Sequence, residues 1–357
     1  MNSKYKYSTL YNKLKDRISS GRYPSGEKLP TESALMKEFT LSRQTVRQAL
    51  SCLENEGFIV KRQGSGSIVK EPGDLPLRER SNTTIAVITT YISEYIFPDI
   101  LRAIVDYLSD RAYQTMIFAT RNRVDNERKI LNGLLDQPLA GLIIEGTKSA
   151  LPNPNIDLYR EFERRQVPIV FIHATYPELT NTACVVADDK QGGKIATNYL
   201  IAKGHKKIAG IFKSDDLQGH LRYAGYTESM RENNLTITDN NVLWYTTESS
   251  ELIADFGLRT IENCTALLCY NDEIALKMLN LLRENDIRIP EDISIISFDN
   301  STYSELSTPK ISSCSQRKRQ IGALSAKKLL NLIHGIEQES SMIKWRIIEK
   351  ESIKNIT

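Results

Sequence analysis

A short segment near the start of the chain carries polar side chains that can hydrogen-bond the edges of base pairs. Within five positions it holds Arg43, Gln44, Thr45 and Arg47. In the major groove of DNA, arginine pairs with guanine and glutamine pairs with adenine, so these residue types suit base readout. The alternative is an ordinary solvated helix face, which polar residues at this spacing also form.

A second basic segment follows closely and has the pattern of a hairpin. Apolar stretches at 58–60 and 67–69 flank a glycine-rich turn, which lets the backbone approach a phosphate or a minor groove. Lys61 and Arg62 add phosphate contacts whose strength falls with salt. Because both segments favour the same partner, we prefer nucleic-acid binding to a solvated face.

Three helical patterns position these side chains. Apolar residues at helical spacing predict a first helix over 8–20, and Thr31 offers a hydroxyl N-cap for a second. Ser42 caps a third helix, which carries the polar side chains on its outer face. Glu32 lies in the first turn of the second helix. It either reaches the edge of the DNA or interacts with the helix N-terminus, and the sequence leaves both open.

Charge is distributed unevenly along the chain. Residues 1–70 carry thirteen Lys and Arg against six Asp and Glu, a net charge of +7, whereas the whole chain has a net charge of only +3. A basic head on an acidic body suggests a polyanionic partner for the head alone.

A length of 357 residues predicts more than one domain. We expect a DNA-binding domain over 1–70, a linker over 71–82, and a larger domain over 83–357.

The head resembles the GntR-type winged helix of bacterial regulators over almost all of residues 1–70. The stretches that carry this resemblance are YPSGEKLPTESAL, LSRQTVRQALSCLENEGFI and RQGSGSIV. The resemblance implies double-stranded operator DNA as the partner and Arg43 and Arg47 as the principal readers. It also implies a supporting set at the DNA surface, namely Gln44, Thr45, Gln63, Gly64 and Gly66.

From residue 83 onward, apolar strands alternate with helices. Strands are predicted over 83–90, 115–119, 141–144, 168–172, 184–187, 208–212, 266–269 and 294–298. Helical runs between them are predicted over 98–112, 127–135, 190–203, 221–233 and 272–285. This alternation predicts parallel sheets covered by helices on both faces, and its length predicts two α/β lobes.

Polar and aromatic side chains follow successive strands of this region, where ligands of such sheets bind. Those of interest are Tyr91, Tyr95, Glu145, Lys148, His173, Asn271 and Asp299. Carboxylates and amides can hydrogen-bond adjacent hydroxyls while aromatic rings cover C–H faces, so the set suits a polyhydroxylated ligand. Individually, Asn271 can be a helix cap and Tyr91 a core residue. Their recurrence at strand ends favours one shared cleft.

Enzymatic interpretations find little support in the sequence. Gln191-Gly192-Gly193-Lys194 resembles part of a phosphate-binding loop, but the first glycine and the hydroxyl residue of that motif are missing. The four histidines lack metal-ligand spacing, and the five scattered cysteines include no C-x-x-C pair. We therefore expect no catalytic residue, metal site or cofactor. An enzyme such as a sugar kinase fused to a DNA-binding head remains the rival from another class.

The body resembles the LacI/GalR-type sensor domain over roughly residues 83–350. This resemblance rests on GGKIATNYLIAKGHKKIAGIF, LRYAGYTESM, CYNDEIALKMLNLLRENDIRIPEDISIISFDNS and QIGALSAKKLLNLI. It implies that Arg222, Asn271 and Asp299 grip effector hydroxyls. It also implies that the lobes exchange segments, so that residues after about 315 return to the first lobe.

The pairing of these two parts is similar to regulators of L-arabinose utilisation in Gram-positive bacteria. TTYISEYIFPDI, EGTKSALPNPNI, GIFKSDDLQG and LCYNDEIALK carry this similarity. It implies a homodimeric repressor released from DNA by a monosaccharide, with L-arabinose as the expected effector. A different sugar, a sugar phosphate or a nucleoside is the alternative. Without a signal peptide or a membrane-spanning apolar run, we expect the protein in the cytoplasm, with no membrane partner.

Overall fold

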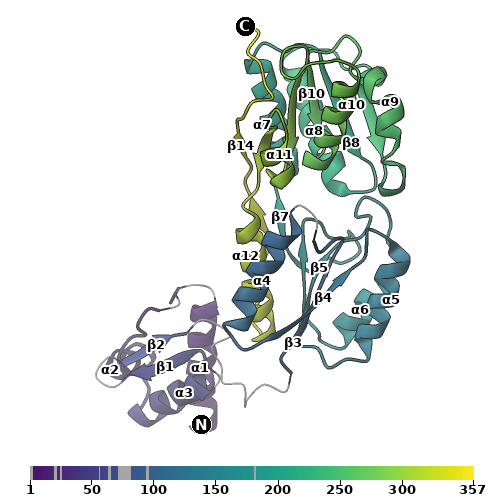
Figure 1. Cartoon of the computed structure of the whole chain (residues 1–357). Helices are drawn as coiled ribbons and strands as arrows, with labels where there is room; N and C mark the ends of the chain where they lie inside the picture. Colours follow the sequence, from purple (N-terminus) through teal and green to yellow (C-terminus); the bar gives the residue numbers. More distant parts are fainter. Residues whose placement is uncertain are drawn as a thin grey trace.

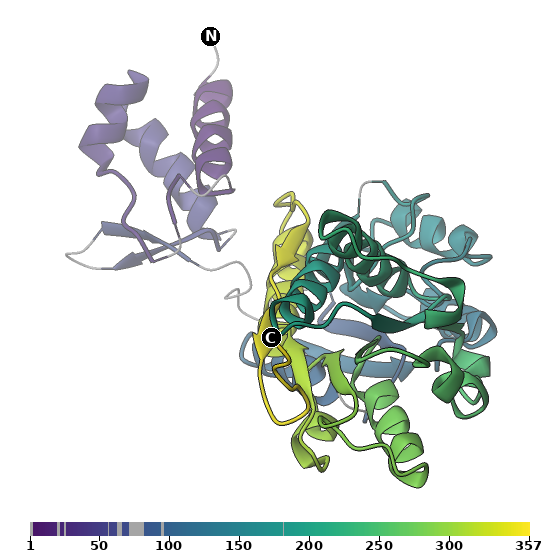
Figure 2. The same cartoon turned by 90° about the horizontal axis from the view of Figure 1, so that it is seen from above.

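The chain folds into a small head and a larger body with two lobes (Figure 1). The computed structural model describes residues 3–19, 22–24, 26–55, 57–62, 66–70, 82–93, 96–180 and 182–357. Two views show the head to one side of the body, on the side of helix α12 (Figures 1 and 2). None of the helices in these ranges combines the length and apolar character needed to cross a membrane.

The head consists of three helices and a two-stranded antiparallel hairpin. Its elements are α1 (Ser3–Ser19), α2 (Glu32–Phe39), α3 (Arg43–Asn55), β1 (Ile59–Arg62) and β2 (Gly66–Val69). The predicted caps are present, because Thr31 Oγ1 accepts from Ala34 N at 3.2 Å and Ser42 Oγ accepts from Thr45 N at 3.3 Å. The apolar stripes of the three helices form one core around Leu14, which is fully buried. The winged-helix prediction is confirmed.

Lobe 1 is built on a six-stranded parallel sheet of order β13-β7-β6-β5-β3-β4. Its strands are β3 (Thr84–Thr89), β4 (Gln114–Ala119), β5 (Gly141–Glu145), β6 (Ile169–Ile172), β7 (Ala183–Ala187) and β13 (Ser341–Ile343). Successive residues of β3 point to opposite faces, and both faces are buried. One face packs on α4 (Phe97–Ser109) and α12 (Lys318–Ile333), the other on α5 (Val124–Leu135) and α6 (Ile156–Arg164). Two covered faces explain why these strands are continuously apolar.

Lobe 2 repeats this plan with sheet order β14-β12-β11-β10-β8-β9, in which only β14 is antiparallel to its neighbour. Its strands are β8 (Ile208–Lys213), β9 (Val242–Tyr245), β10 (Ala266–Cys269), β11 (Ser294–Phe298), β12 (Ser312–Ser315) and β14 (Arg346–Ile348). Helices α7 (Asp189–Ala202) and α8 (Leu217–Glu232) cover one face, and α9 (Leu252–Thr260) and α10 (Asp272–Glu284) cover the other. The remaining short elements are α11 (Thr302–Leu306) and the 3-10 turns Asp239–Asn241 and Thr247–Ser249.

The chain crosses between the lobes three times. It passes from β7 to α7, returns from β12 to α12, and passes again from β13 to β14. The prediction that residues after about 315 return to the first lobe is therefore confirmed for α12 and β13, whereas β14 belongs to lobe 2. Gly193 and Gly225 serve a packing role, because a side chain on either would collide with the backbone of the facing helix. These glycines bring α7 and α8 together.

Candidate functional site

The two arginines predicted as principal base readers are exposed on α3 and share one carboxylate partner. The side chains of Arg43 and Arg47 are 66% and 60% exposed, and their Nε atoms donate to Glu32 at 3.1 and 3.0 Å. Burial alone would raise the pKa of Glu32, but the two arginines lower it below its ordinary value. Glu32 therefore lies at the start of α2 and also orients both arginines on the exposed face.

The other head residues predicted to contact DNA differ in how far the structure places them at the surface. Gln44 is exposed beside the arginines, whereas Thr45 is only 9% exposed and its hydroxyl contacts Ser42 Oγ at 2.8 Å. The expected outward position of Thr45 is wrong, because its hydroxyl takes part in the cap of α3. Lys61 on β1 pairs with Glu54 at 2.6 Å, and Gly66 begins β2. The side chain of Arg62, together with Gln63 and Gly64, lies outside the described residues.

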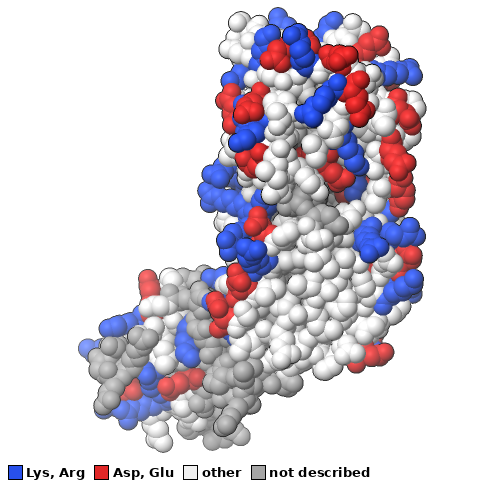
Figure 3. Space-filling view, in the orientation of Figure 1, with Lys and Arg blue, Asp and Glu red and all other residues white. Residues whose placement is uncertain are grey.

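Lys and Arg side chains are visible on the side of the head that faces away from the body (Figure 3). Exposed cations on this surface suit a polyanionic duplex, because their contacts with phosphates release bound counterions. The head therefore exposes Arg43 and Arg47, and their predicted contacts with bases stay a prediction.

The two lobes enclose one polar cavity of about 110 Å³ at the carboxyl ends of their strands. Lobe 1 contributes Thr90, Tyr91, Ile96, Phe97, Glu145 and His173. Lobe 2 contributes Lys213, Asp216, Gln218, Arg222, Tyr245, Thr247, Ser250, Tyr270, Asn271, Glu273, Ile274 and Asp299. Six of the eight residues predicted from the sequence thus line one cavity: Tyr91, Glu145, His173, Arg222, Asn271 and Asp299.

Arg222 is the most buried charged group of the cavity wall, with 1% exposure. Its Nε donates to Asp189 Oδ1 at 2.8 Å and its Nη1 donates to the carbonyl oxygen of Tyr270 at 2.5 Å. The guanidinium also lies 4.4 Å from the ring centre of Phe298 and 5.1 Å from that of Trp345. Burial opposes its charge, but the neighbouring carboxylates raise the pKa of Arg222 above its ordinary value. The arginine is thus held rigidly beside the cavity.

Glu145 and His173 form the polar wall of lobe 1. The carboxylate of Glu145 accepts from Thr90 N at 2.8 Å and contacts His173 Nδ1 at 2.7 Å. Burial opposes both charges, but the pair lowers the pKa of Glu145 and raises the pKa of His173. His173 Nε2 is buried and has no hydrogen-bond partner in the described structure. It is therefore available to a ligand hydroxyl.

Asp299 and Asn271 form the polar wall of lobe 2. Burial raises the pKa of Asp299 to about 6, although Arg222 at 3.8 Å opposes this effect. Asn271 caps α10 by accepting from Ile274 N at 3.0 Å, so the cap interpretation is confirmed while the residue also lines the cavity. Asp272 lies behind it and accepts from the hydroxyls of three serines, which ties together the ends of β10, β11 and β12.

Several lining residues were missed by the sequence reasoning. Lys213 ends β8, and its Nζ donates to Asp216 Oδ2 at 2.7 Å. Burial lowers the pKa of Lys213, but Asp216 and Asp215 outweigh it and raise that pKa. Applying the strand-end rule to β8 would have found Lys213. Tyr245 ends β9, a strand that the sequence analysis did not predict.

Two predicted effector residues are not placed in the cavity. Tyr95 lies outside the described residues. Lys148 is described, but it is not among the residues that line the cavity, and its Nζ lies 2.6 Å from Glu248 of the opposite lobe. A direct role of Lys148 in effector binding stays a prediction.

Comparison with known proteins assigns both parts of the chain. Residues 6–69 match the model of bacterial regulatory proteins of the gntR family, and residues 197–353 match the periplasmic binding protein-like domain. The chain is 39% identical to the arabinose metabolism transcriptional repressor of Halalkalibacterium halodurans, over 94% of this chain and 90% of that protein. The chain belongs to this repressor family. The same repressor of Geobacillus stearothermophilus is also 39% identical, over 92% and 91%.

Solved structures of regulators share the fold of the body. The transcription regulator CcpA of Lactococcus lactis has a TM-score of 0.68 at 25% identity, covering 76% of this chain and all of that chain. A periplasmic binding protein/LacI transcriptional regulator of Alkaliphilus metalliredigens, complexed with D-xylulofuranose, has a TM-score of 0.67 at 22% identity, covering 76% and 99%. The predicted fold class is confirmed, and so is the prediction of a transcription repressor.

Proposed function

We propose that the head binds operator DNA and that the cavity binds L-arabinose, which weakens the hold of the head on DNA. The observation that carries the proposal is the cavity, in which predicted strand-end residues of both lobes meet. A ligand that contacts both lobes binds the closed arrangement better than the open one. It can therefore shift the equilibrium between two states by the difference in its affinities for them.

The charges of the cavity favour a neutral ligand. Among the described lining residues, three carry nitrogen groups that can be cationic: His173, Lys213 and Arg222. Each lies within 2.8 Å of a carboxylate oxygen, so a phosphate would find no unpaired cation there. Carboxylate oxygens and His173 Nε2 instead suit hydroxyl groups. A sugar is therefore favoured over a sugar phosphate.

Cavity size and family membership narrow the choice of sugar. A volume of about 110 Å³ is well below that of cavities for larger organic ligands, so one small molecule fits rather than a disaccharide. Two relatives at 39% identity carry names that refer to arabinose metabolism. Among pentoses, L-arabinose is thus the first candidate.

Calorimetry on the full chain tests the effector. Titration with L-arabinose, D-xylose, D-ribose and D-glucose should give heat of binding with L-arabinose at a dissociation constant at least tenfold below those of the others. A gel shift with operator DNA should then show release over the same range of L-arabinose concentration. Operator affinity that is indifferent to all four sugars would remove the sensor function.

We propose that the repressor acts as a homodimer whose two heads bind paired half-sites. Lobe 1 presents a broad, largely uncharged face (Figure 3). Met116 and Ile117 are each 37% exposed on β4, which is an edge strand of that lobe. Such apolar exposure is typical of an interface between subunits. Sedimentation of the full chain should give a dimer, and the double variant Met116→Glu, Ile117→Lys should give a monomer.

Helix α12 supports a route from cavity to head. At its start, Lys318 Nζ donates to the carbonyl oxygens of Asp299 and Asn300 at 3.2 and 2.8 Å. Just after its end, Ile336 is 5% exposed and packs with the apolar core of the head. Ile336→Ser should therefore leave the affinity for L-arabinose unchanged and reduce the effect of the sugar on operator binding. Unchanged release of DNA would exclude this route.

We propose further that the chain has no catalytic activity and works in the cytoplasm, where operator DNA is found. The relatives at 39% identity are transcriptional repressors, which supports this assignment over a kinase fused to a DNA-binding head. Incubation of the full chain with ATP and L-arabinose should give no turnover. Phosphorylated sugar among the products would revive the enzymatic alternative.

A further inference from the structure

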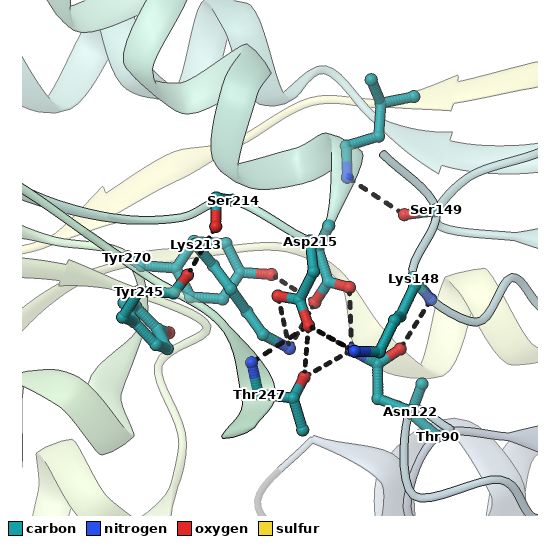
Figure 4. Close-up of polar contacts among 12 residues, drawn as sticks. Thr90, Asn122, Lys148, Ser149, Lys213, Ser214, Asp215, Tyr245, Thr247 and Tyr270 are labelled. Atoms are coloured by element: carbon teal, nitrogen blue, oxygen red, sulfur yellow. Dashed lines mark hydrogen bonds and ion pairs between the residues drawn. The ribbon is translucent and has the colours of Figure 1, made fainter. Parts of the chain in front are cut away.

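Side chains at the edge of the cavity join the two lobes directly. Asn122, from the loop after β4 in lobe 1, points at lobe 2 (Figure 4). Its Nδ2 lies 2.6 Å from Thr247 Oγ1, 3.2 Å from Asp216 Oδ1 and 3.3 Å from Asp215 Oδ2. One carboxamide of lobe 1 thus meets three acceptors of lobe 2.

Asn122 is held in this position by its own lobe. Its side-chain oxygen accepts from Lys148 N at 2.7 Å, and its backbone nitrogen donates to Thr120 Oγ1 at 3.2 Å. Its backbone lies in the left-handed region with a φ of 54°, which asparagine tolerates better than most residues. The side chain is fully buried. Asn122 therefore presents its donors to lobe 2 without losing much conformational freedom on closure.

Two neighbours of Asn122 add further links between the lobes. Lys148 Nζ lies 2.6 Å from Glu248 and 4.0 Å from Asp215. Ser149 Oγ accepts at 3.0 Å from Leu217 N, the first backbone nitrogen of α8, whose N-cap residue makes no side-chain cap bond. Because α8 carries Arg222, lobe 1 completes the N-terminus of the helix that holds this arginine.

Asp216 connects these links with the cavity. Its Oδ1 receives Asn122, while its Oδ2 receives Lys213 Nζ at 2.7 Å and Tyr270 OH at 3.3 Å. Asp216 and Lys213 line the cavity, whereas Asn122 does not. The contacts between the lobes therefore lie beside the ligand site and share one wall with it.

We infer that Asn122, Lys148 and Ser149 of lobe 1 form an interlobe clasp with a set of residues in lobe 2, namely Asp215, Asp216, Leu217, Thr247 and Glu248. The clasp raises the fraction of the protein that is closed before an effector binds, and Asn122 is a positioning residue for effector binding. Because only the closed state has a complete cavity, the measured dissociation constant equals the intrinsic one divided by the closed fraction. Asn122 and Lys148 thus influence effector affinity although neither lines the cavity. The identity of the effector rests on the proposed function. The closure of the two lobes by the clasp does not depend on which effector binds.

The lobe separation of the ligand-free full chain tests the clasp. Spin labels at Lys129→Cys on α5 and Asp255→Cys on α9 report this distance, since both sites are exposed and lie in different lobes. The partly exposed Cys52 and Cys264 are first replaced by serine. Asn122→Ala removes the contacts of this carboxamide with lobe 2, so it should shift the distance distribution to longer values. It should also raise the dissociation constant for L-arabinose at least about tenfold.

Three further variants sharpen the test. Asn122→Asp keeps the shape but sets a carboxylate against Asp215 and Asp216, so it should open the lobes more than Asn122→Ala. Lys148→Glu should also open them, and adding Glu248→Lys should restore part of the closed population. Arg128→Ala is the matched control, because its ion pair with Asp157 lies within lobe 1 and should leave the distance unchanged.

The outcomes separate the clasp from the effector assignment. An unchanged distance distribution in the two Asn122 variants and in Lys148→Glu would overturn the clasp, even if their thermal stability fell. A shifted distribution supports the clasp, and if the parent protein then binds no L-arabinose, only the effector assignment fails. The side chain of Lys148 is 19% exposed whereas Asn122 is fully buried, so the Lys148 variant keeps the test valid if a substitution at Asn122 prevents folding.

Discussion

The substitution Asp299→Asn separates charge from shape in the cavity wall. Asp299 is 2% exposed, and burial raises its pKa to about 6 against the attraction of Arg222. The carboxylate is therefore ionised at neutral pH in a setting that disfavours its charge. Asparagine has nearly the same shape and stays neutral at every pH, so the variant removes this unfavourable charge.

The expected gain in stability follows from the two pKa values. The pKa of Asp299 is raised in the folded protein. Its favourable contribution to the free energy of unfolding is therefore complete below pH 3.8 and is lost as the pH rises through about 6. A shift from 3.8 to about 6 corresponds to ~3 kcal/mol. Asp299→Asn should therefore raise the free energy of unfolding by about 3 kcal/mol at pH 7.5 and by about half as much at pH 5.

Urea unfolding followed by tryptophan fluorescence measures this difference. The two tryptophans of the chain, Trp244 and Trp345, lie on β9 and beside β14, so the signal reports on lobe 2. Calorimetry should show that the same variant binds L-arabinose about 10- to 100-fold more weakly, because a hydrogen bond to a charged group is lost. Gain of stability and loss of binding together would mark a residue kept for function.

The matched control is an aspartate whose pKa is lowered rather than raised in the folded protein. Asp292 is exposed, and its hydrogen bonds with Arg288 lower its pKa to about 2, so Asp292→Asn should bring no gain in stability. The reasoning is refuted if Asp299→Asn is less stable than the parent at pH 7.5, or if the difference does not change between pH 7.5 and pH 5. Unchanged affinity for every sugar would show that Asp299 does not contact the effector.

Three further predictions concern the head and the arginine of the cavity. Arg47→Ala should weaken operator binding in a gel shift by ~1–3 kcal/mol and leave sugar affinity unchanged, and weaker sugar binding would contradict the division between head and body. Arg222→Lys keeps a buried cation for Asp189 but loses the planar guanidinium with its several donors. Calorimetry should therefore show weaker sugar binding, and a gel shift should show that operator release needs more sugar. Thr31→Ala removes the cap of α2 and should lower the stability of the head by ~1 kcal/mol in thermal unfolding.

The head was predictable because its signals are local. The caps at Thr31 and Ser42 and the apolar stripes of three helices are all read within a few residues. Thr45 is the exception, since its position in the sequence is compatible with the outer face. Its burial depends on a hydroxyl contact with Ser42 that helical periodicity does not reveal.

The strands that were missed depend on contacts far along the chain. β12 is a run of Ser312, Ser313, Cys314 and Ser315, which has no apolar pattern although it is buried. Its polar groups are satisfied by Asp272, 41 residues earlier in the chain, and by Ser352, 40 residues later. β9 and β14 are short edge strands of lobe 2. Hydrophobic periodicity cannot find strands whose burial is compensated by such distant hydrogen bonds.

Lys148 marks the limit of the strand-end rule. The rule predicts that residues at and just after the end of β5 lie at the cleft, and Glu145 and Lys148 both do. It does not predict whether a side chain faces the cavity or the opposite lobe, because that depends on how closely the lobes approach. Asn122 belongs to no motif and follows the edge strand β4, yet it carries the main contact between the lobes. The residues that bind a ligand can be predicted from one lobe at a time, whereas the residues that close the cleft become visible only when both lobes are in place.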